Sequence, residues 1–285
     1  MPSNKVTPEI RRQAIVSYKK KLYLEPFLAS DMRRSFRQMI RSFMITYPRM
    51  QQTAMPSAYY ADVTGHLRDH YRRVIKRFKS TYRDSQHKKK ARQLNPDNEI
   101  DKIIDEKLHD YILEHSEDQA RVIIRTTESE LRKSILKIQS DAAKAGKPID
   151  ANEIAKLVAD DYSRKINGRA SVISTTETNG MAEKTKLAEL GAIRDWWNDD
   201  DDAVNDPDFP DAEDDAEAEP AFNRIWVAVL DDHTRDAHAE ADGQEVEEGQ
   251  PFVVDGEELE SPGDPSGSPE NIINCRCDAV AIPAR

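Results

Sequence analysis

The segment Arg224-Ile-Trp-Val-Ala-Val-Leu-Asp-Asp-His-Thr-Arg-Asp-Ala-His238 decides the fold class of this 285-residue chain. Its first seven residues are apolar except for Arg224, and a short apolar run that contains Trp, Ile and Val is typical of a β-strand. Before residue 195, by contrast, apolar residues recur every three or four positions, which is the period of amphipathic helices. We therefore expect an α+β fold, in which a long-helix-rich N-terminal region precedes a small α+β C-terminal domain of short strands.

Turn and capping signals divide the helical part into segments. Gly168 and Gly191 are interpreted as helix ends, since glycine commonly follows the last helical residue. We expect helices to begin near Pro8, Ser30, Ala58, Asn95, Asp150 and Arg169, to end near Pro48 and Gln93 as well as at the two glycines, and to be interrupted near Ser116. The expected domains are a basic helical region at 1–95, a helical region at 96–168, and a C-terminal domain at 169–285 with an acidic loop at 195–220.

Charge is unevenly distributed along the chain. Residues 1–100 hold 22 Lys and Arg against 8 Asp and Glu, although the whole chain has a net charge of −11. Residues 195–219 hold 13 acidic residues and no basic one, so we expect a solvated loop there. A basic half of this kind indicates nucleic acid or an acidic protein surface as a partner. The candidate contact residues lie on one predicted helix and are Arg68, Arg72, Arg73, Lys76, Arg77 and Lys79.

His238, Cys275 and Cys277 are candidate metal ligands. Thiolate and imidazole donors suit zinc, and alternation along a strand would place both cysteines on one face. Two features argue against a metal: the Cys-x-Cys spacing is shorter than zinc sites usually have, and Asp232 or His233 would have to supply a fourth ligand. The same residues also fit small, reduced core cysteines or a Cys–His nucleophilic site. We prefer the structural interpretation, so no cofactor is expected, and zinc is the alternative.

Other polar residues of the C-terminal domain are expected to stabilise it. A small, loop-rich domain with a thin core needs polar contacts to specify its conformation. We expect a buried polar network formed by Asp232, Arg235, His238 and Glu177, with Arg276 on the face opposite the two cysteines.

The C-terminal motifs follow one another in a defined order. Glu177 belongs to a Thr-Glu pair on a predicted helix, and Trp226 lies on the predicted strand. After them come Asp232-x-Thr-Arg235-x-x-His238, Asp242-Gly243, Pro-Gly-Asp264 and Asn-Cys275-Arg276-Cys277. This ordered set, over roughly residues 165–282, resembles the Mu-F-like family of phage minor head proteins. The acidic tract at 195–219 departs from the family pattern, because the resemblance implies a short connection at that place.

The resemblance implies a structural, non-enzymatic protein of tailed-phage heads. Such a protein is made in the bacterial host cytoplasm, becomes part of the virion, and acts in head morphogenesis at or near the portal. Its expected partners are the portal protein and other head proteins, with packaged DNA as a further contact. Some domains of the family look like delivery modules fused to toxins.

Two other function classes remain open from the residues themselves. One is a metal-dependent or Cys–His enzyme built on His238, Cys275 and Cys277, and the other is a non-specific DNA-binding protein. No stretch approaches the roughly 18 apolar residues of a membrane-spanning helix, so no membrane segment is expected.

Overall fold

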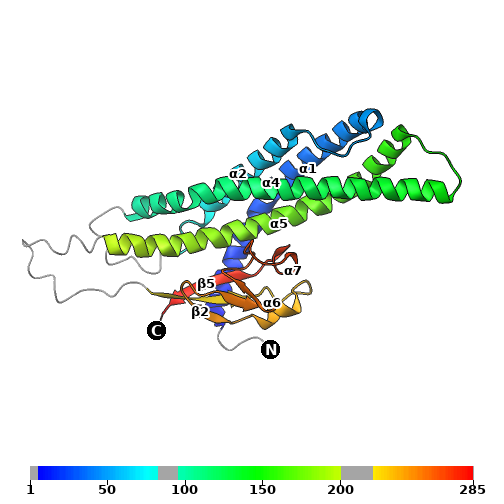
Figure 1. The fold of residues 1–285 in the computed structure, drawn as a ribbon. Helices are drawn as coiled ribbons and strands as arrows, with labels where there is room; N and C mark the ends of the chain where they lie inside the picture. The colour runs from blue at the N-terminus through cyan, green and yellow to red at the C-terminus, as the bar shows by residue number, and fades with distance from the viewer. Residues whose placement is uncertain (1–5, 83–95, 200–220, 285) are drawn as a thin grey trace, which may run out of the picture. The chain divides into compact units, whose positions relative to one another are not determined.

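The structure is a computed structural model that describes residues 6–82, 96–199 and 221–284 (Figure 1). Four long helices form its N-terminal part: α1 (Pro8–Met50), α2 (Ser57–Phe78), α4 (Pro96–Lys144) and α5 (Ala151–Asp199). Short antiparallel strands follow in the C-terminal part, which confirms the α+β fold class. None of the helices in the described ranges is both long enough and apolar enough to cross a membrane.

The C-terminal part contains two small antiparallel sheets and two short helices. The first sheet has the order β2-β1-β5 and consists of β1 (Phe222–Val227), β2 (Glu245–Glu247) and β5 (Asp278–Pro283). The second is a hairpin of β3 (Phe252–Val254) and β4 (Glu257–Leu259), and the helices are α6 (Asp236–Glu240) and α7 (Pro269–Ile272). Asp255 and Gly256 form the hairpin turn with φ values of 52° and 77°, the left-handed region that such two-residue turns require.

Both faces of β1 are buried, which explains its continuous apolar sequence. Trp226 lies on one face, in a core that includes Phe252 and Leu259. Ile225 and Val227 lie on the other face, where they pack with apolar residues near the start of α1. Because successive side chains of a strand point to opposite faces, a strand between two apolar layers reads as an apolar run.

Contacts divide the chain into two compact units that are discontinuous in sequence. The first unit comprises Met1–Tyr23, Arg73–Asp110 and Thr175–Arg285, and it contains all the strands of the described residues. The second unit comprises Leu24–Arg72 and Tyr111–Ser174 and is helical. Each of the four long helices contributes to both units, and the domain boundary expected at residue 168 falls inside α5.

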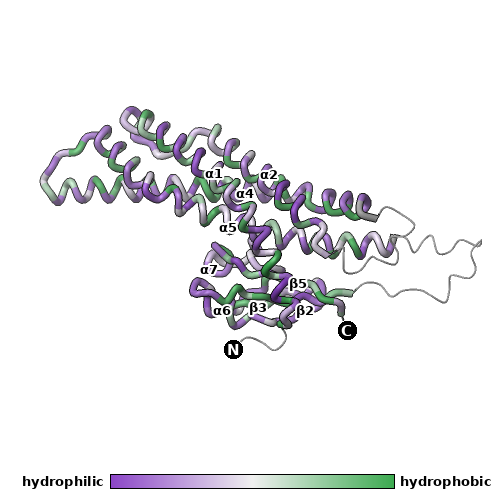
Figure 2. Tube along the Cα trace, turned by 180° about the vertical axis from the view of Figure 1, so that it is seen from behind, coloured by the Kyte–Doolittle hydropathy of each residue, from purple (hydrophilic) through white to green (hydrophobic). Residues whose placement is uncertain are grey.

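The second unit is a helix assembly with an aromatic and polar interior. Phe36 packs edge-on against Tyr162, with ring centroids 6.1 Å apart, and the Arg169 guanidinium lies over the Phe36 ring. Arg169 also pairs with Glu130 at 2.7 Å. Apolar and polar residues alternate in short steps along the helices (Figure 2), as expected of amphipathic helices that share a core.

The helix break expected near Ser30 is wrong, because α1 runs without interruption from Pro8 to Met50. Leu28 and Met32, on either side of the expected break, are completely buried. Packing of this apolar stripe outweighs the local signals, including Pro26 inside the helix.

The helix interruption expected near Ser116 is also wrong, because α4 continues without a break to Lys144. The Ser116 hydroxyl donates a hydrogen bond to the Leu113 carbonyl at 3.0 Å, so the serine is accommodated within the helix.

The helix ends expected at Gly168 and Gly191 are wrong as well, because α5 continues to Asp199. Trp196 and Trp197 lie beyond Gly191 and are buried. Burying two such side chains stabilises the helix by several times the roughly 1 kcal/mol that a helical glycine costs. The start of α5 is as expected: the Glu153 amide donates to Asp150 Oδ1 at 2.8 Å.

The acidic loop expected at 195–220 begins later than predicted. Residues 195–199 belong to α5, and Asp195 pairs with Lys107 at 2.7 Å. The rest of that prediction, at 200–220, lies outside the described residues.

The helix expected from Ala58 to Gln93 ends at Phe78. The Glu189 carboxylate accepts hydrogen bonds from the amides of Thr81 and Tyr82, at 2.9 and 3.0 Å. These bonds stabilise the turn that follows α2. The remainder of that predicted helix, from residue 83, lies outside the described residues.

Two glycines of α5 provide a test of helix packing in the first and second units. A Cβ on Gly180 would lie 3.0 Å from the Gly263 carbonyl oxygen, whereas a Cβ on Gly168 would meet nothing within 4 Å. We expect Gly180→Ala to lower the free energy of unfolding by about 1–3 kcal/mol, because a backbone neighbour must shift. Gly168→Ala should raise it by about 0.5–1 kcal/mol through helix propensity. Urea unfolding of the full chain measures both, and equal effects would contradict this account of Gly180.

Candidate functional site

The first unit contains a buried charge cluster of four ionisable side chains that come from three elements. Lys21 is on α1, Glu183 and Lys186 are on α5, and Asp278 begins β5. Lys21 Nζ lies 2.6 Å from Glu183 Oε1 and 3.2 Å from Asp278 Oδ1. Lys186 lies 2.8 Å from Glu183 Oε1 and also pairs with Asp278. None of the four residues is more than 3% exposed, so water does not compensate these charges.

Backbone groups of β5 complete the hydrogen bonding of this charge cluster. Lys186 Nζ donates to the Ala279 carbonyl at 3.0 Å, and the Ala279 amide donates to Glu183 Oε2 at 3.0 Å. The Tyr82 hydroxyl donates to the same Ala279 carbonyl at 3.1 Å. The cluster therefore holds one end of β5 against α5 and the segment that follows α2.

Burial and neighbouring charges shift the pKa values of these groups in different directions. Burial, together with the Asp278 carboxylate, raises the pKa of Glu183 to about 8. Burial also opposes ionisation of Asp278, but Lys186 and Lys21 outweigh it and hold the pKa of Asp278 well below its usual range. Glu183 is therefore the member of the cluster that gains or loses a proton near neutral pH.

A cavity of about 420 Å³ adjoins the charge cluster, between α1 and strands β1 and β5. Its lining combines apolar residues such as Val16 and Val280 with Ser17 and Lys20. Burial, and next the charge of Arg77, lower the pKa of Lys20. Such a mixture of apolar walls and a few polar groups could accommodate a small ligand, but no contact in the structure defines its chemistry.

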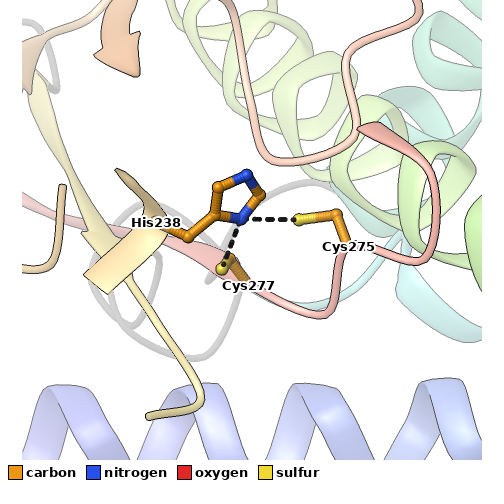
Figure 3. Close-up of side chains that lie close together, drawn as sticks. All are labelled: His238, Cys275 and Cys277. Carbon is orange, nitrogen blue, oxygen red and sulfur yellow. Dashed lines mark hydrogen bonds between the residues drawn. The ribbon is translucent and has the colours of Figure 1, made fainter. Parts of the chain in front are cut away.

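His238, Cys275 and Cys277 form a second buried cluster (Figure 3). Nδ1 of His238 lies 3.4 Å from Cys277 Sγ and 3.7 Å from Cys275 Sγ. The histidine belongs to α6, and the cysteines belong to the extended segment before β5. Hydrogen bonding from Cys277 lowers the pKa of Cys275 well below its usual value, and the same interaction raises the pKa of Cys277.

The prediction that both cysteines face the core, beside a buried His238, is confirmed. Both are at most 3% exposed and belong to the core around Trp226. Arg276, between them, points elsewhere and makes two hydrogen bonds to Asp231 at 2.6 and 2.7 Å. Alternation of side chains along an extended segment accounts for this arrangement.

The predicted buried polar network has a different membership from the one expected. Asp232 is exposed, and its neighbour Asp231 binds Arg276 instead, because the turn after β1 directs Asp231 toward the Cys-Arg-Cys segment. Arg235 is half-buried and donates to the Ile273 carbonyl at 2.5 Å. Glu177 is buried on α5, as expected.

The remaining motif residues stabilise turns and hold neighbouring helices and strands together. Asp242 accepts a hydrogen bond from the Ala228 amide at 2.9 Å and also pairs with Arg11 of α1. Gly243 has φ of 81° and donates to the Trp226 carbonyl at 2.8 Å. Asp264 accepts hydrogen bonds from the amides of Glu260 and Ser266, at 2.7 and 3.0 Å.

Trp226 is completely buried at the centre of the C-terminal core. Its ring meets those of His238 and Phe252 edge-on, with centroid distances of 5.6 and 5.4 Å. The Arg224 guanidinium lies 5.1 Å from the centroid of the Phe252 ring and donates to the carbonyls of Gln250 and Glu260. No role was predicted for Arg224 from the sequence, although a single cation inside an apolar strand indicates a buried contact.

The charge cluster was also not predicted from the sequence. Lys21 lies on the buried stripe of α1, between Ser17 and Leu24. A charged residue at a stripe position predicts a buried partner, but the sequence cannot identify that partner. Glu183 and Asp278 are far from Lys21 in sequence, so only the fold brings them together.

Two of the six predicted basic contact residues pair with acidic residues of α4. Arg68 pairs with Glu117 at 2.8 Å in the second unit. Lys79 pairs with Asp101 at 2.9 Å and with Asp105 at 3.5 Å in the first unit.

The other four basic residues lie on the exposed side of α2: Arg72, Arg73, Lys76 and Arg77. Arg72 pairs with Asp69 of the same helix at 3.3 Å, and such exposed pairs contribute little to stability. Because all four side chains are exposed, they are the candidates for an external contact.

Comparison with known proteins yields one partial relative. NAD(+)--arginine ADP-ribosyltransferase EFV of Enterococcus faecalis is 35% identical over 61 residues, which are 21% of this chain and 12% of that protein. This chain thus matches only about an eighth of the relative's length. No protein-family model matches the sequence, and no solved structure matches it. The similarity to an enzyme is too short to decide whether this chain has catalytic activity.

The pKa of Glu183 leads to a prediction about pH and stability. Because the pKa is about 8 in the folded state and 4.5 is its ordinary value, the folded state binds more protons between these values. We therefore expect the free energy of unfolding to fall as pH rises from about 5 through 8. Glu183→Gln should remove this dependence, as measured by urea unfolding at several pH values. Glu260→Gln, at an exposed residue, is the control and should keep it; an unchanged pH dependence in Glu183→Gln would contradict the assignment.

Proposed function

We propose that this chain is a structural minor head protein of a tailed bacteriophage, which acts in head morphogenesis at or near the portal. It is made in the host cytoplasm and incorporated into the virion. The observation that carries this proposal is that the C-terminal motif residues stabilise the fold. The motif residues whose contacts are described above bind other parts of the first unit.

Three contacts show how the motifs are used. Asp242 connects α1 to the end of β1 through Arg11 and the Ala228 amide. The Asn274 amide donates to Thr176 Oγ1 on α5 at 2.8 Å. Side chains and amides engaged in this way are not available to a substrate, which favours a structural role for the motif set that resembles the Mu-F-like family.

The exposed cations of α2 supply a surface for the proposed partners. Arg72, Arg73, Lys76 and Arg77 form the exposed α2 cations, a set that lies within two helical turns. Dense cations without a base-reading motif bind phosphates or acidic protein surfaces without sequence preference. Packaged DNA and an acidic face of a head protein both fit this chemistry.

The partial enzyme relative is compatible with this proposal. The shared 61 residues make up 12% of the ADP-ribosyltransferase, so its activity is not transferred to this chain. The resemblance to the Mu-F-like family itself leads us to expect segments shared with larger toxins. We therefore propose a non-enzymatic protein without a catalytic cofactor.

Co-expression with the portal protein of the same phage tests the proposal directly. We expect the full chain to co-purify with portal assemblies and to remain bound through size-exclusion chromatography, since a head component must bind its neighbours in the head. A chain that never associates with portal or other head proteins would contradict the proposal. So would transfer of ADP-ribose from NAD to arginine by the purified chain.

The DNA contact is tested separately by the salt dependence of binding. The full chain should bind random duplex DNA and lose affinity steeply between 50 and 200 mM salt, with a slope near −0.9 per phosphate contacted. Changing the four exposed α2 cations to Gln should reduce that slope by up to about 3 to 4. A matched control changes four exposed lysines elsewhere: Lys133, Lys137, Lys144 and Lys156. Equal losses in the two variants would contradict a specific role for α2.

A further inference from the structure

The donor atoms of His238, Cys275 and Cys277 converge on one point in the core of the first unit. The one nitrogen and two sulfur atoms all lie within 4.8 Å of one another. The residues are 2%, 2% and 3% exposed, so each donor atom faces protein rather than solvent. Figure 3 shows the histidine ring directing Nδ1 toward both sulfurs.

The separations of these atoms fit a single tetrahedral metal ion. Zinc binds sulfur at about 2.3 Å and imidazole nitrogen at about 2.0–2.1 Å, which places the nitrogen and each sulfur roughly 3.5 Å apart around a tetrahedral ion. The observed Nδ1–Sγ distances are 3.4 and 3.7 Å. Both nitrogen–sulfur separations therefore match those expected around one tetrahedral zinc ion.

The alternative to a metal is a pair of hydrogen bonds, one from a thiol to Nδ1 and one between the two cysteines. A neutral imidazole has one acceptor nitrogen with one in-plane lone pair, so Nδ1 can accept a proton from only one thiol at a time. Both sulfurs nevertheless approach the same nitrogen. A divalent ion with two thiolates and a neutral imidazole is an electrically neutral complex, which lowers the cost of placing these groups in an apolar core.

The segments that carry the ligands are positioned by contacts outside the cluster. Arg276 is bound by Asp231 on the side away from the sulfurs, and Arg235, directly before α6, binds the Ile273 carbonyl. The His238 ring stands perpendicular to Trp226, at 90°. These contacts hold α6 and the Cys-Arg-Cys segment together and thus preorganise the three donor atoms.

We propose that His238 Nδ1, Cys275 Sγ and Cys277 Sγ bind one zinc ion that joins α6 to the segment before β5. Among the described residues, no fourth His, Cys, Asp or Glu side chain belongs to this group. Asp232 and His233, the fourth ligands considered from the sequence, are both exposed. A water molecule would complete a four-coordinate shell and keep the complex neutral. Two thiolates and an imidazole favour zinc over magnesium or calcium, which prefer oxygen ligands.

This zinc site is independent of the proposed head function. A metal that joins two short segments can stabilise a small, loop-rich core in any functional context. Loss of zinc and loss of portal binding are thus separate measurements, and either result can be obtained without the other.

Metal analysis of the full chain, purified without chelators, tests the site. We expect about one zinc per chain, and X-ray absorption should show two sulfur ligands near 2.3 Å and nitrogen or oxygen ligands near 2.0–2.1 Å. Cys275→Ser, Cys277→Ser and His238→Gln should each reduce the zinc content at least tenfold. His233→Gln changes an exposed histidine on the same segment and should retain one zinc per chain.

A second measurement uses the unmodified chain and does not depend on how the variants fold. After removal of metal by a chelator, cobalt(II) should restore a thiolate-to-metal charge-transfer absorption, and zinc should then protect both thiols from alkylation. The proposal is overturned if folded, reduced wild-type protein takes up neither metal, or if both thiols react equally fast with and without zinc. It is also overturned if bound zinc persists undiminished in the cysteine variants.

Discussion

The first unit depends on burying four ionisable side chains where α1, α5 and β5 meet. Removing an ion from water costs several kcal/mol even in a relaxed protein interior, so each member needs its partners at hydrogen-bonding distance. Lys21 and Lys186 therefore constrain the positions of Glu183 and Asp278 closely. A shift of β5 by one residue would turn Asp278 to the other face and leave the lysines uncompensated. The charge cluster thus specifies the register in which the helices meet the sheet.

The charge cluster and the His–Cys cluster are adjacent along the chain and share one backbone segment. Asp278 follows Cys277 directly, and Lys21 Nζ donates to the Cys277 carbonyl at 3.4 Å. This short stretch thus directs the thiols of Cys275 and Cys277 toward α6, and the next residue, Asp278, pairs with lysines of α1 and α5. Placement of this stretch connects the polar interior of the helices to the apolar core around Trp226.

Such an interior suits a protein whose role is to hold a shape while its surface binds partners. Polar residues in the described core bind other residues of the chain, whereas four cations of α2 remain exposed. An ADP-ribosyltransferase shares a segment with this chain, but that segment is 12% of the enzyme. The contacts of the C-terminal motif residues and the exposed basic residues of α2 both fit the role in head assembly that we propose.

The sequence by itself determined the fold class, the strand at Trp226 and the common face of Cys275 and Cys277, because apolar periodicity and the alternation of side chains along a strand are local properties. Only the tertiary structure decided where helices end, since burial of Trp196 and Trp197 outweighs the local preference of Gly191 to end a helix. It also decided which residues pair: Asp231 and not Asp232 binds Arg276, and Lys21 meets Asp278 across 257 positions. Such pairs depend on how distant segments pack, and the short-range pattern of a single chain carries no record of that packing.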